Sequence, residues 1–357
     1  MLAISPSRLI VGAGSNLYSY AFNASPNAIS PSVISEGVIS LLGRSDSGRT
    51  ITGITFIDDG GFDRTLHVAF QDGAIERILL TQPTPNHVNQ SVSLSAIQTN
   101  LNPMPIGDFV ESLSSEANFV LTLSSTGYVR LSDLLSEHTN STIELNTRSW
   151  VAHLCLQSST PYAALGTASS APLIVHSVTD GQLSPRPFAI LHTPKSIESA
   201  ATDRQHFSAV YGLSRGPLNS PWGSSPQILV SGWFDGHVRC YDLRSSSRSS
   251  SEPISGKPST PAPLRPVLSL ADRWSYEPIY SVSCGGGSAS YIAAGTARHS
   301  VVSFWDIRSP KNGWSVHAPG NDPSPVYSVV LESSRFFGVT QSRPFVYDFV
   351  SLYHPHT

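Results

Sequence analysis

The first residues of this chain whose spacing could support chemistry are Gly12 and Gly14, which follow the apolar run 9–11. A strand that leads into closely spaced glycines can begin a dinucleotide-binding loop if a small residue stands at the sixth position and a helix follows. Here the sixth position is Leu17, and the aromatic-rich residues around it have neither a helix cap nor helical spacing. The pattern therefore favours a β-hairpin turn without a phosphate ligand.

Other arrangements that could catalyse a reaction or bind a metal are missing from the sequence. It contains no G-x-S-x-G, no H-E-x-x-H and no P-loop lysine motif, and the glycines at 285–287 are expected in a loop between strands. Cys155, Cys240 and Cys284 are far apart and form no C-x-x-C, which argues against a disulfide framework or a structural zinc site. We expect no enzyme activity, no cofactor and no metal, and a cytoplasmic or nuclear protein.

Composition narrows the class of fold and of partner. The chain has 357 residues, of which only 13% are charged, and it is rich in glycine (26) and proline (27), a combination that indicates many short strands joined by turns. A net charge of -3 offers no general attraction to nucleic acid or to anionic lipid, and no apolar run is long enough to span a membrane. Neither nucleic acid nor a membrane is an expected partner.

The opening hairpin recurs along the chain, which is the mark of a repeat protein. Each copy has an apolar strand, a turn of small or polar residues and a second strand, and further strand candidates stand before and after most copies. This predicts an all-β, seven-bladed β-propeller with four strands per blade, formed as one domain by residues 1–350. The copies lie at 8–23, 66–80, 118–135, 162–181, 228–244, 291–308 and 335–350.

Several dipeptides in these copies resemble the signature of WD-repeat proteins, and the resemblance extends over nearly the full length. Trp305-Asp306 and Tyr241-Asp242 end strands, while Asp72-Gly73 and Asp235-Gly236 lie in turns. The chain departs from the family in that no Gly-His pair precedes the first strand of any copy, and three copies keep none of these dipeptides.

The C-terminal third resembles the last blades of dactylin-type F-box/WD-repeat proteins, most clearly in the S-P-V-Y at 324–327 and the F-V-Y-D-F at 345–349. The resemblance implies a propeller that binds a protein substrate for an SCF-type cullin ubiquitin ligase. In that family an F-box ahead of the propeller binds the ligase adaptor; the F-box itself is not present in this chain. A WD-repeat assembly scaffold without ubiquitination is an alternative function.

Further predictions concern the closure of the propeller, the C-terminal tail and one insert. Residues 351–357 form a short tail, so the last blade is expected to lack its closing strand, which sequence upstream of Met1 would supply. His354 and His356 belong to this tail and are not expected to bind metal. The Ser/Pro-rich stretch 245–266 has too few apolar residues to order itself and is expected to be a mobile surface insert.

Turns between the middle strands of the blades provide the expected partner-binding residues. In WD repeats these turns lie on the face that most often binds proteins, and aromatic and arginine side chains are enriched at binding hot spots. Trp233 could instead pack in the core, and Asp235 could make a hydrogen bond within its own blade. The expected partner is a protein or a peptide, bound by Trp233, His237, Arg298, His299, Gln341 and Arg343.

Arg244 and Arg308 end the related motifs Y-D-L-R and W-D-I-R. Similar paired motifs occur in receptors that dock on the damaged-DNA-binding adaptor of a different cullin ligase, so the two arginines are alternative adaptor-docking residues. Each arginine could also do no more than pair with a surface carboxylate, a contact of small energetic value.

Overall fold

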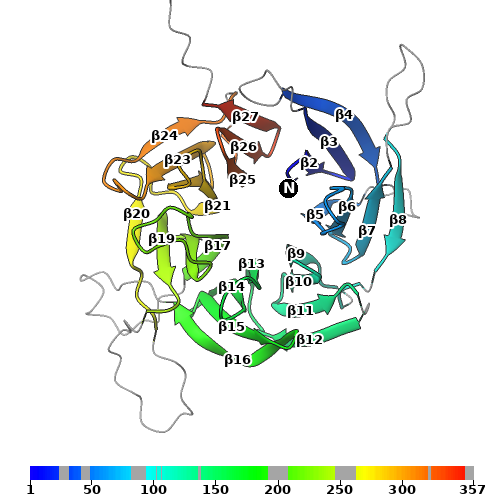
Figure 1. The fold of residues 1–357 in the computed structure, drawn as a ribbon, viewed down its shortest axis with the longest axis horizontal. Helices are drawn as coiled ribbons and strands as arrows, with labels where there is room; N and C mark the ends of the chain where they lie inside the picture. The colour runs from blue at the N-terminus through cyan, green and yellow to red at the C-terminus, as the bar shows by residue number, and fades with distance from the viewer. Residues whose placement is uncertain are drawn as a thin grey trace, which may run out of the picture.

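The computed structural model shows antiparallel sheets arranged in a ring, a β-propeller (Figure 1). The expected all-β propeller is therefore confirmed. The structure describes residues 1–23, 32–41, 49–81, 94–101, 103–105, 107–135, 138–191, 208–245, 263–320 and 323–349. Most of the expected insert 245–266, and the tail with His354 and His356, lie outside these residues. Within them, no helix is both long and apolar enough to cross a bilayer.

The strands follow one another around the ring in chain order, and in each group the first strand lies innermost (Figure 1). The first group is β1 (Leu2–Ile4), β2 (Arg8–Ala13), β3 (Asn16–Asn23) and β4 (Ser32–Ser40), and the second is β5 (Ile51–Phe56), β6 (Thr65–Phe70), β7 (Ile75–Leu80) and β8 (Ala96–Asn100). The third is β9 (Val110–Glu116), β10 (Phe119–Ser124), β11 (Tyr128–Asp133) and β12 (His138–Glu144), and it is followed by β13 (Ser149–Cys155), β14 (Tyr162–Ser169), β15 (Leu173–Thr179) and β16 (Gln182–Leu191). The remaining strands are β17 (Ser208–Arg215), β18 (Ile228–Trp233), β19 (His237–Asp242), β20 (Leu268–Ala271), β21 (Ile279–Gly285), β22 (Tyr291–Thr296), β23 (Val301–Asp306), β24 (Trp314–His317), β25 (Val326–Glu332), β26 (Arg335–Thr340) and β27 (Pro344–Asp348).

The prediction of seven separate four-stranded blades is wrong. Hydrogen bonds join the described strands into six sheets: four with four strands, one with eight and one with three. The eight-stranded sheet arises because β14 extends far enough to pair with β17, with Ala168 opposite Ala209 and Ser169 opposite Ser208. The three-stranded sheet is β25–β27, and residues 350–357, which follow it, lie outside the described residues.

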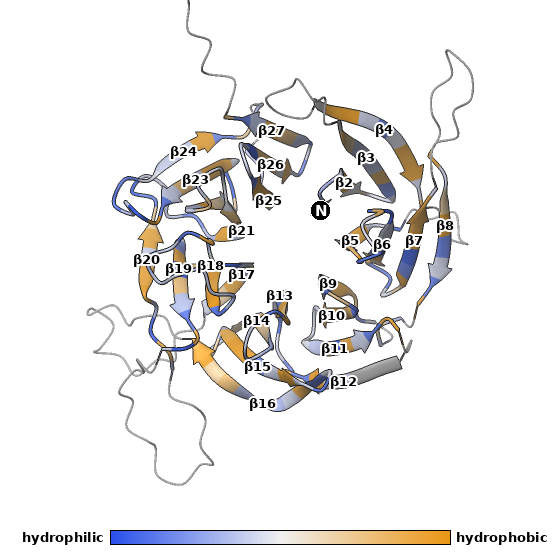
Figure 2. Cartoon of the chain, in the orientation of Figure 1, coloured by the Kyte–Doolittle hydropathy of each residue, from blue (hydrophilic) through white to orange (hydrophobic). Residues whose placement is uncertain are grey.

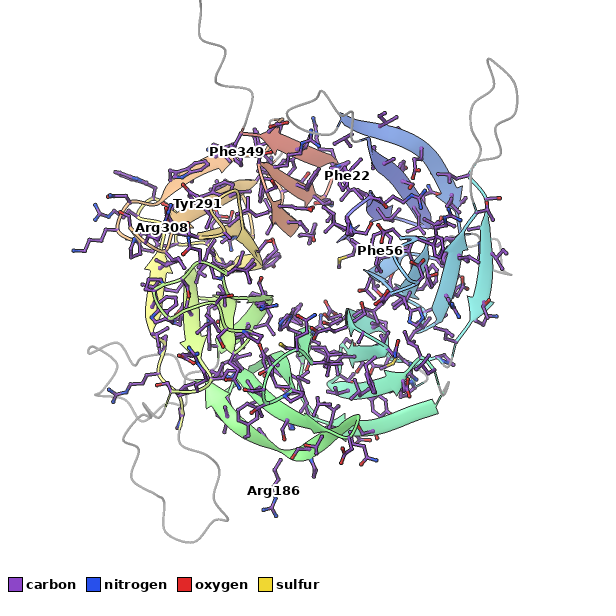
Figure 3. All side chains as sticks on the ribbon, viewed as in Figure 1. Phe22, Phe56, Arg186, Tyr291, Arg308 and Phe349 are labelled. Atoms are coloured by element: carbon purple, nitrogen blue, oxygen red, sulfur yellow. The ribbon has the colours of Figure 1, made fainter. Side chains whose placement is uncertain are left out.

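Apolar side chains fill the spaces between neighbouring sheets, and Figure 2 shows apolar stretches in strands all around the ring. The first and last sheets also meet in this way, because Leu9 and Val11 of β2 share a buried cluster with Phe337 and Val339 of β26. Phe22 (Figure 3) packs against Phe337 with ring centroids 5.6 Å apart. Side-chain packing therefore closes the ring.

Six of the innermost strands share one irregularity near their first residues. In β5, β9, β13, β17, β21 and β25 the register with the second strand shifts by one residue, so that one residue is left unpaired in a β-bulge. In β1 the register is continuous. A bulge re-aims the side chain that it carries, and bulges are frequent beside functional sites. The residues at this position are Thr52, Glu111, Trp150, Tyr211, Tyr280 and Tyr327.

Candidate functional site at the inner rim of the ring

Four aromatic residues at successive bulge positions form a continuous row of ring contacts. The ring centroids of Trp150 and Tyr211 are 4.9 Å apart, those of Tyr211 and Tyr280 are 5.0 Å apart, and those of Tyr280 and Tyr327 are 6.3 Å apart. Phe234, in the turn after β18, joins the row 6.4 Å from Tyr211. These five residues are called the aromatic arc below.

The aromatic arc is accessible from outside the protein. Phe234 is 54% exposed and Tyr327 is 43% exposed, while Trp150, Tyr211 and Tyr280 are partly buried. Burial, reinforced by the neighbouring Tyr280, raises the pKa of Tyr211, so that its phenol stays protonated and can donate a hydrogen bond. Stiff aromatic side chains lose little entropy on binding and offer large contact area, which is why they dominate protein interfaces.

Arg148 ends the aromatic arc on the side of β9. Its guanidinium carbon lies 3.8 Å from the centroid of the Trp150 ring, and its Nη1 lies 2.8 Å from Oε2 of Glu111. Burial raises the pKa of Glu111 even though Arg148 favours the carboxylate. The indole N–H of Trp150 is buried and has no acceptor among the described residues. The arc thus combines aromatic surface with a cation stacked on one of its rings.

The turn between β18 and β19 is held by an internal ion pair. Arg239 donates two hydrogen bonds to the Asp235 carboxylate, with N–O distances of 3.0 and 2.6 Å, and its guanidinium carbon lies 4.9 Å from the Trp233 ring centroid. Burial opposes the charge on Asp235, but the hydrogen bonds from His237 and Arg239 outweigh it and hold the pKa of Asp235 well below its usual range. Asp235 therefore makes hydrogen bonds within its own repeat, which was the alternative to a contact with a partner.

Trp233 packs in the core, which was the alternative to the expected partner contact. Its side chain is fully buried, and its Nε1 donates to the hydroxyl of Ser231 at 2.7 Å. It belongs to the hydrophobic core, and its neighbour Phe234 presents the exposed aromatic ring of this turn. The reason is that β18 continues through Trp233, whereas the repeat pattern predicted this residue in the turn.

The other expected partner-binding residues lie near the aromatic arc. His237 is the first residue of β19 and is partly exposed where the β18–β19 turn ends. The remaining four are exposed in two further turns, Arg298 and His299 between β22 and β23, and Gln341 and Arg343 between β26 and β27. These turns share one end of the ring, here named the turn end, with the bulges. Pairing of Ile279 with Thr296 and of Val326 with Thr340 fixes this proximity.

Arg244 and Arg308 lie at the opposite end of the ring, after β19 and β23. Each bonds the aspartate two residues earlier: Arg244 Nε lies 2.8 Å from Asp242, and Arg308 Nη2 lies 2.6 Å from Asp306. Arg244 also donates to the carbonyl of Trp222 at 3.0 Å. Both arginines are exposed, and Arg308 is labelled at the outer part of the ring in Figure 3. The two motifs have the same local geometry, in which the arginine pairs with its own strand.

The described residues contain no group of three or more histidine, cysteine, aspartate or glutamate side chains placed to hold a metal ion. Cys155 and Cys240 are buried thiols and Cys284 is partly buried. Burial raises the pKa of Cys284 to about 12, so its reactive thiolate form is suppressed at neutral pH.

Comparison with known proteins supports the fold. No family model and no curated protein matches the chain, so the dactylin-type resemblance gains no support from either comparison. Among solved structures, the chain is similar to Sqt1 of Chaetomium thermophilum bound to the N-terminus of the ribosomal protein L10, with a TM-score of 0.62 and 13% identity. The similarity covers 97% of this chain and 82% of the other. At this identity the likeness concerns the propeller fold alone.

Proposed function

We propose that the chain is a non-catalytic protein-interaction propeller that binds a peptide segment of a partner protein on the aromatic arc. The observation that carries the proposal is the row of four aromatic side chains at equivalent bulges, extended by the exposed Phe234. Adjacent innermost strands hold these rings, so little further ordering is required on binding. The similar Sqt1 structure, which is bound to the N-terminus of another protein, supports a peptide as the ligand.

A finer proposal is that the peptide belongs to a substrate of an SCF-type ubiquitin ligase, as the resemblance to F-box/WD-repeat proteins implies. The alternative attachment uses Arg244 and Arg308 on the damaged-DNA-binding adaptor of another cullin ligase. Both guanidinium groups keep exposed surface after pairing with their aspartates, which is compatible with a second contact. A scaffold function requires neither attachment. The cysteines are free thiols, and this favours a cytoplasmic or nuclear location of the protein under each of these three candidate functions.

The test compares the partners of four forms of the chain by affinity purification and mass spectrometry. We expect Tyr280→Ala with Tyr327→Ala to lose its partners, because truncation of aromatic hot spots costs about tenfold or more in affinity. Arg186→Ala is the matched control, since Arg186 projects from the outer side of the ring (Figure 3). Unchanged partners in the double tyrosine variant would disprove the proposed site, provided that its melting temperature matches that of the control.

The fourth form, Arg244→Ala with Arg308→Ala, distinguishes the two proposed ways in which the chain could be attached to a cullin ligase. Loss of cullin components from this form alone favours the damaged-DNA-binding adaptor. Their retention favours attachment through an F-box, and absence of cullin components from every form favours the scaffold.

A further inference from the structure

Three phenol groups of the aromatic arc have no hydrogen-bond partner within the described part of the chain. Tyr211, Tyr280 and Tyr327 contact other rings, but no described group bonds to their hydroxyls. A phenol hydroxyl donates one hydrogen bond. Three neighbouring innermost strands therefore each present one donor beside an aromatic ring to a ligand.

The rings of the arc are inclined to one another and do not form a flat platform. The interplanar angle is 74° between Trp150 and Tyr211, 58° between Tyr211 and Tyr280, and 37° between Tyr280 and Tyr327. The centroids of these neighbours are separated by 4.9, 5.0 and 6.3 Å. A ligand that lies along the row therefore meets ring faces and ring edges at short, repeated intervals.

The innermost strands at the two ends of the row have free edges that already bond to side chains. The hydroxyls of Ser112 and Ser114 in β9 accept from backbone N–H groups of β13 at 3.0 Å, and the hydroxyl of Ser283 in β21 accepts from β25 at 2.9 Å. The donors are the N–H groups of Ala152, Leu154 and Leu331. A ligand that adds a β-strand needs unpaired backbone groups on the edge that it joins. These bonds oppose such an addition and leave side chains to recognise the ligand.

The three strands that hold the tyrosines carry no charge near their bulges. In β17 and β25 the charged residues are Arg215 and Glu332, each the last residue of its strand, and β21 has none. Arg148 and Glu111, at the Trp150 end of the row, are paired with each other at 2.8 Å. Charge complementarity therefore favours a ligand that is uncharged over the tyrosines, since a buried charge would find no partner on these strands.

We infer that the peptide bound by the aromatic arc is a proline-rich segment in the polyproline II conformation. Its proline rings lie against Tyr211, Tyr280 and Tyr327, and its backbone carbonyls accept hydrogen bonds from their phenols. The inference rests on the proposed function, since it specifies the ligand of the same site.

A polyproline II segment fits each of these observations. It has no internal hydrogen bonds, so its carbonyls are available, and proline has no N–H that contact with an aromatic ring would leave unpaired. Two of its residues span about 6.2 Å, which is comparable to the separation of neighbouring rings. Its proline side chains are uncharged, and its extended shape exists before binding, so little entropy is lost when an aromatic surface binds it.

The experiment is selection from a displayed library of random dodecapeptides on four forms of the chain. The forms are the unchanged protein, Tyr280→Phe with Tyr327→Phe, Tyr280→Ala with Tyr327→Ala, and the control Arg186→Ala. The unchanged protein and the control are expected to enrich peptides with closely spaced prolines, and the alanine variant should select none. The phenylalanine variant keeps the rings, so it should bind the selected peptides about two- to tenfold more weakly for each hydroxyl removed, as measured by fluorescence anisotropy.

Each outcome decides the inference, and the four forms separate it from the proposed function. If the unchanged protein selects peptides without enriched proline and the alanine variant loses selection, the inference is wrong and the binding site stands. If the phenylalanine variant binds proline-rich peptides as tightly as the unchanged protein, the phenols do not bond to the ligand and the inference is also wrong. If the unchanged protein selects no peptide, or the alanine variant keeps the same selection, both proposals fail.

Discussion

Two aspartate–arginine ion pairs at opposite ends of the ring show that the burial of the arginine decides what such an ion pair does. Asp235 and Arg239, at the turn end, are joined by two hydrogen bonds, and the arginine is only 5% exposed and packs against Trp233. Asp306 and Arg308, at the other end, are joined just as closely, but the arginine is 51% exposed. The first arginine fastens a turn to the core, and the second leaves much of its guanidinium available to solvent or to a partner.

The comparison teaches that the length of an ion pair does not reveal its importance. A buried arginine has lost its hydration, so removal of its partner leaves an uncompensated charge, whereas an exposed arginine returns to water at little cost. The substitutions below test this difference in order of expected effect.

The largest effect is expected from Trp233→Ala. The substitution removes a fully buried indole beside the Asp235–Arg239 pair and should lower the free energy of unfolding by about 3 to 5 kcal/mol, because the cavity cannot collapse completely. Denaturant unfolding measures this change. If stability stayed unchanged while partner affinity fell, Trp233 would be a surface contact and its burial would be contradicted.

Arg239→Ala should have the next largest effect. It strips the Asp235 carboxylate of two hydrogen bonds and uncovers one side of the Trp233 ring, which should cost about 2 kcal/mol, less than for a wholly buried pair because Asp235 is partly exposed. Denaturant unfolding of Arg239→Ala and of the Arg239→Lys control gives the comparison. We expect the lysine variant to recover part of the loss; equal stability of all three proteins would show that the pair contributes nothing.

A smaller, pH-dependent effect is expected from Asp306→Asn. A hydrogen bond from Arg308 lowers the pKa of Asp306 from 3.8 to about 2, so the folded protein favours the carboxylate more than the unfolded chain does. The native protein should therefore be more stable than the variant above a pH of 3.8, and the difference should fade as the pH drops toward about 2. Melting temperatures of both proteins across the acidic range in which they stay folded measure this. A difference that grew on acidification would reverse the sign and exclude the depressed pKa.

The smallest effect on stability is expected from Arg244→Ala. Its guanidinium is 44% exposed and, among the described residues, bonds Asp242 and the Trp222 carbonyl, so its loss should leave the melting temperature within the range of ordinary surface substitutions. Thermal unfolding beside Arg239→Ala is the measurement. A loss as large as that of Arg239→Ala would remove the distinction between the two ends of the ring.

Local patterns in the sequence predict much of the fold, because a hairpin is specified by its own turn. The strands on either side of Asp235-Gly236 illustrate this, since apolar residues flank a pair suited to positive φ and Gly236 has a φ of 79°. The burial of Trp233 is harder to predict. Every residue of β18 is buried, so the strand shows no alternation that would separate inward from outward positions.

The aromatic arc is built from distant parts of the chain and is for that reason less visible. A sequence signal exists, since an aromatic residue follows the first or third residue of strand candidates in S-W-V, V-Y-G, I-Y-S and V-Y-S, but only the bulges show that these rings meet. The antiparallel pairing of β14 with β17 joins strands of neighbouring repeats. A pattern that recurs within each repeat does not predict which strands of different repeats will pair. Arg298, His299, Gln341 and Arg343 were predictable as exposed turn residues, but their common neighbourhood with His237 was not.

The pairing of Ala168 with Ala209 and of Ser169 with Ser208 has a consequence for how the ring opens. Other neighbouring sheets are held by apolar packing, as between the first and last sheets, or by apolar packing with a single backbone hydrogen bond, as from the Ile51 N–H to the Gly14 carbonyl, whereas β14 and β17 pair as strands over two residues. In a repeat protein each unit unfolds with a free energy set by itself and its neighbours, so an added backbone link increases their cooperativity. Amide hydrogens of β14 and β17 should therefore exchange with solvent in a single opening event, while the junction of β2 with β26 opens separately.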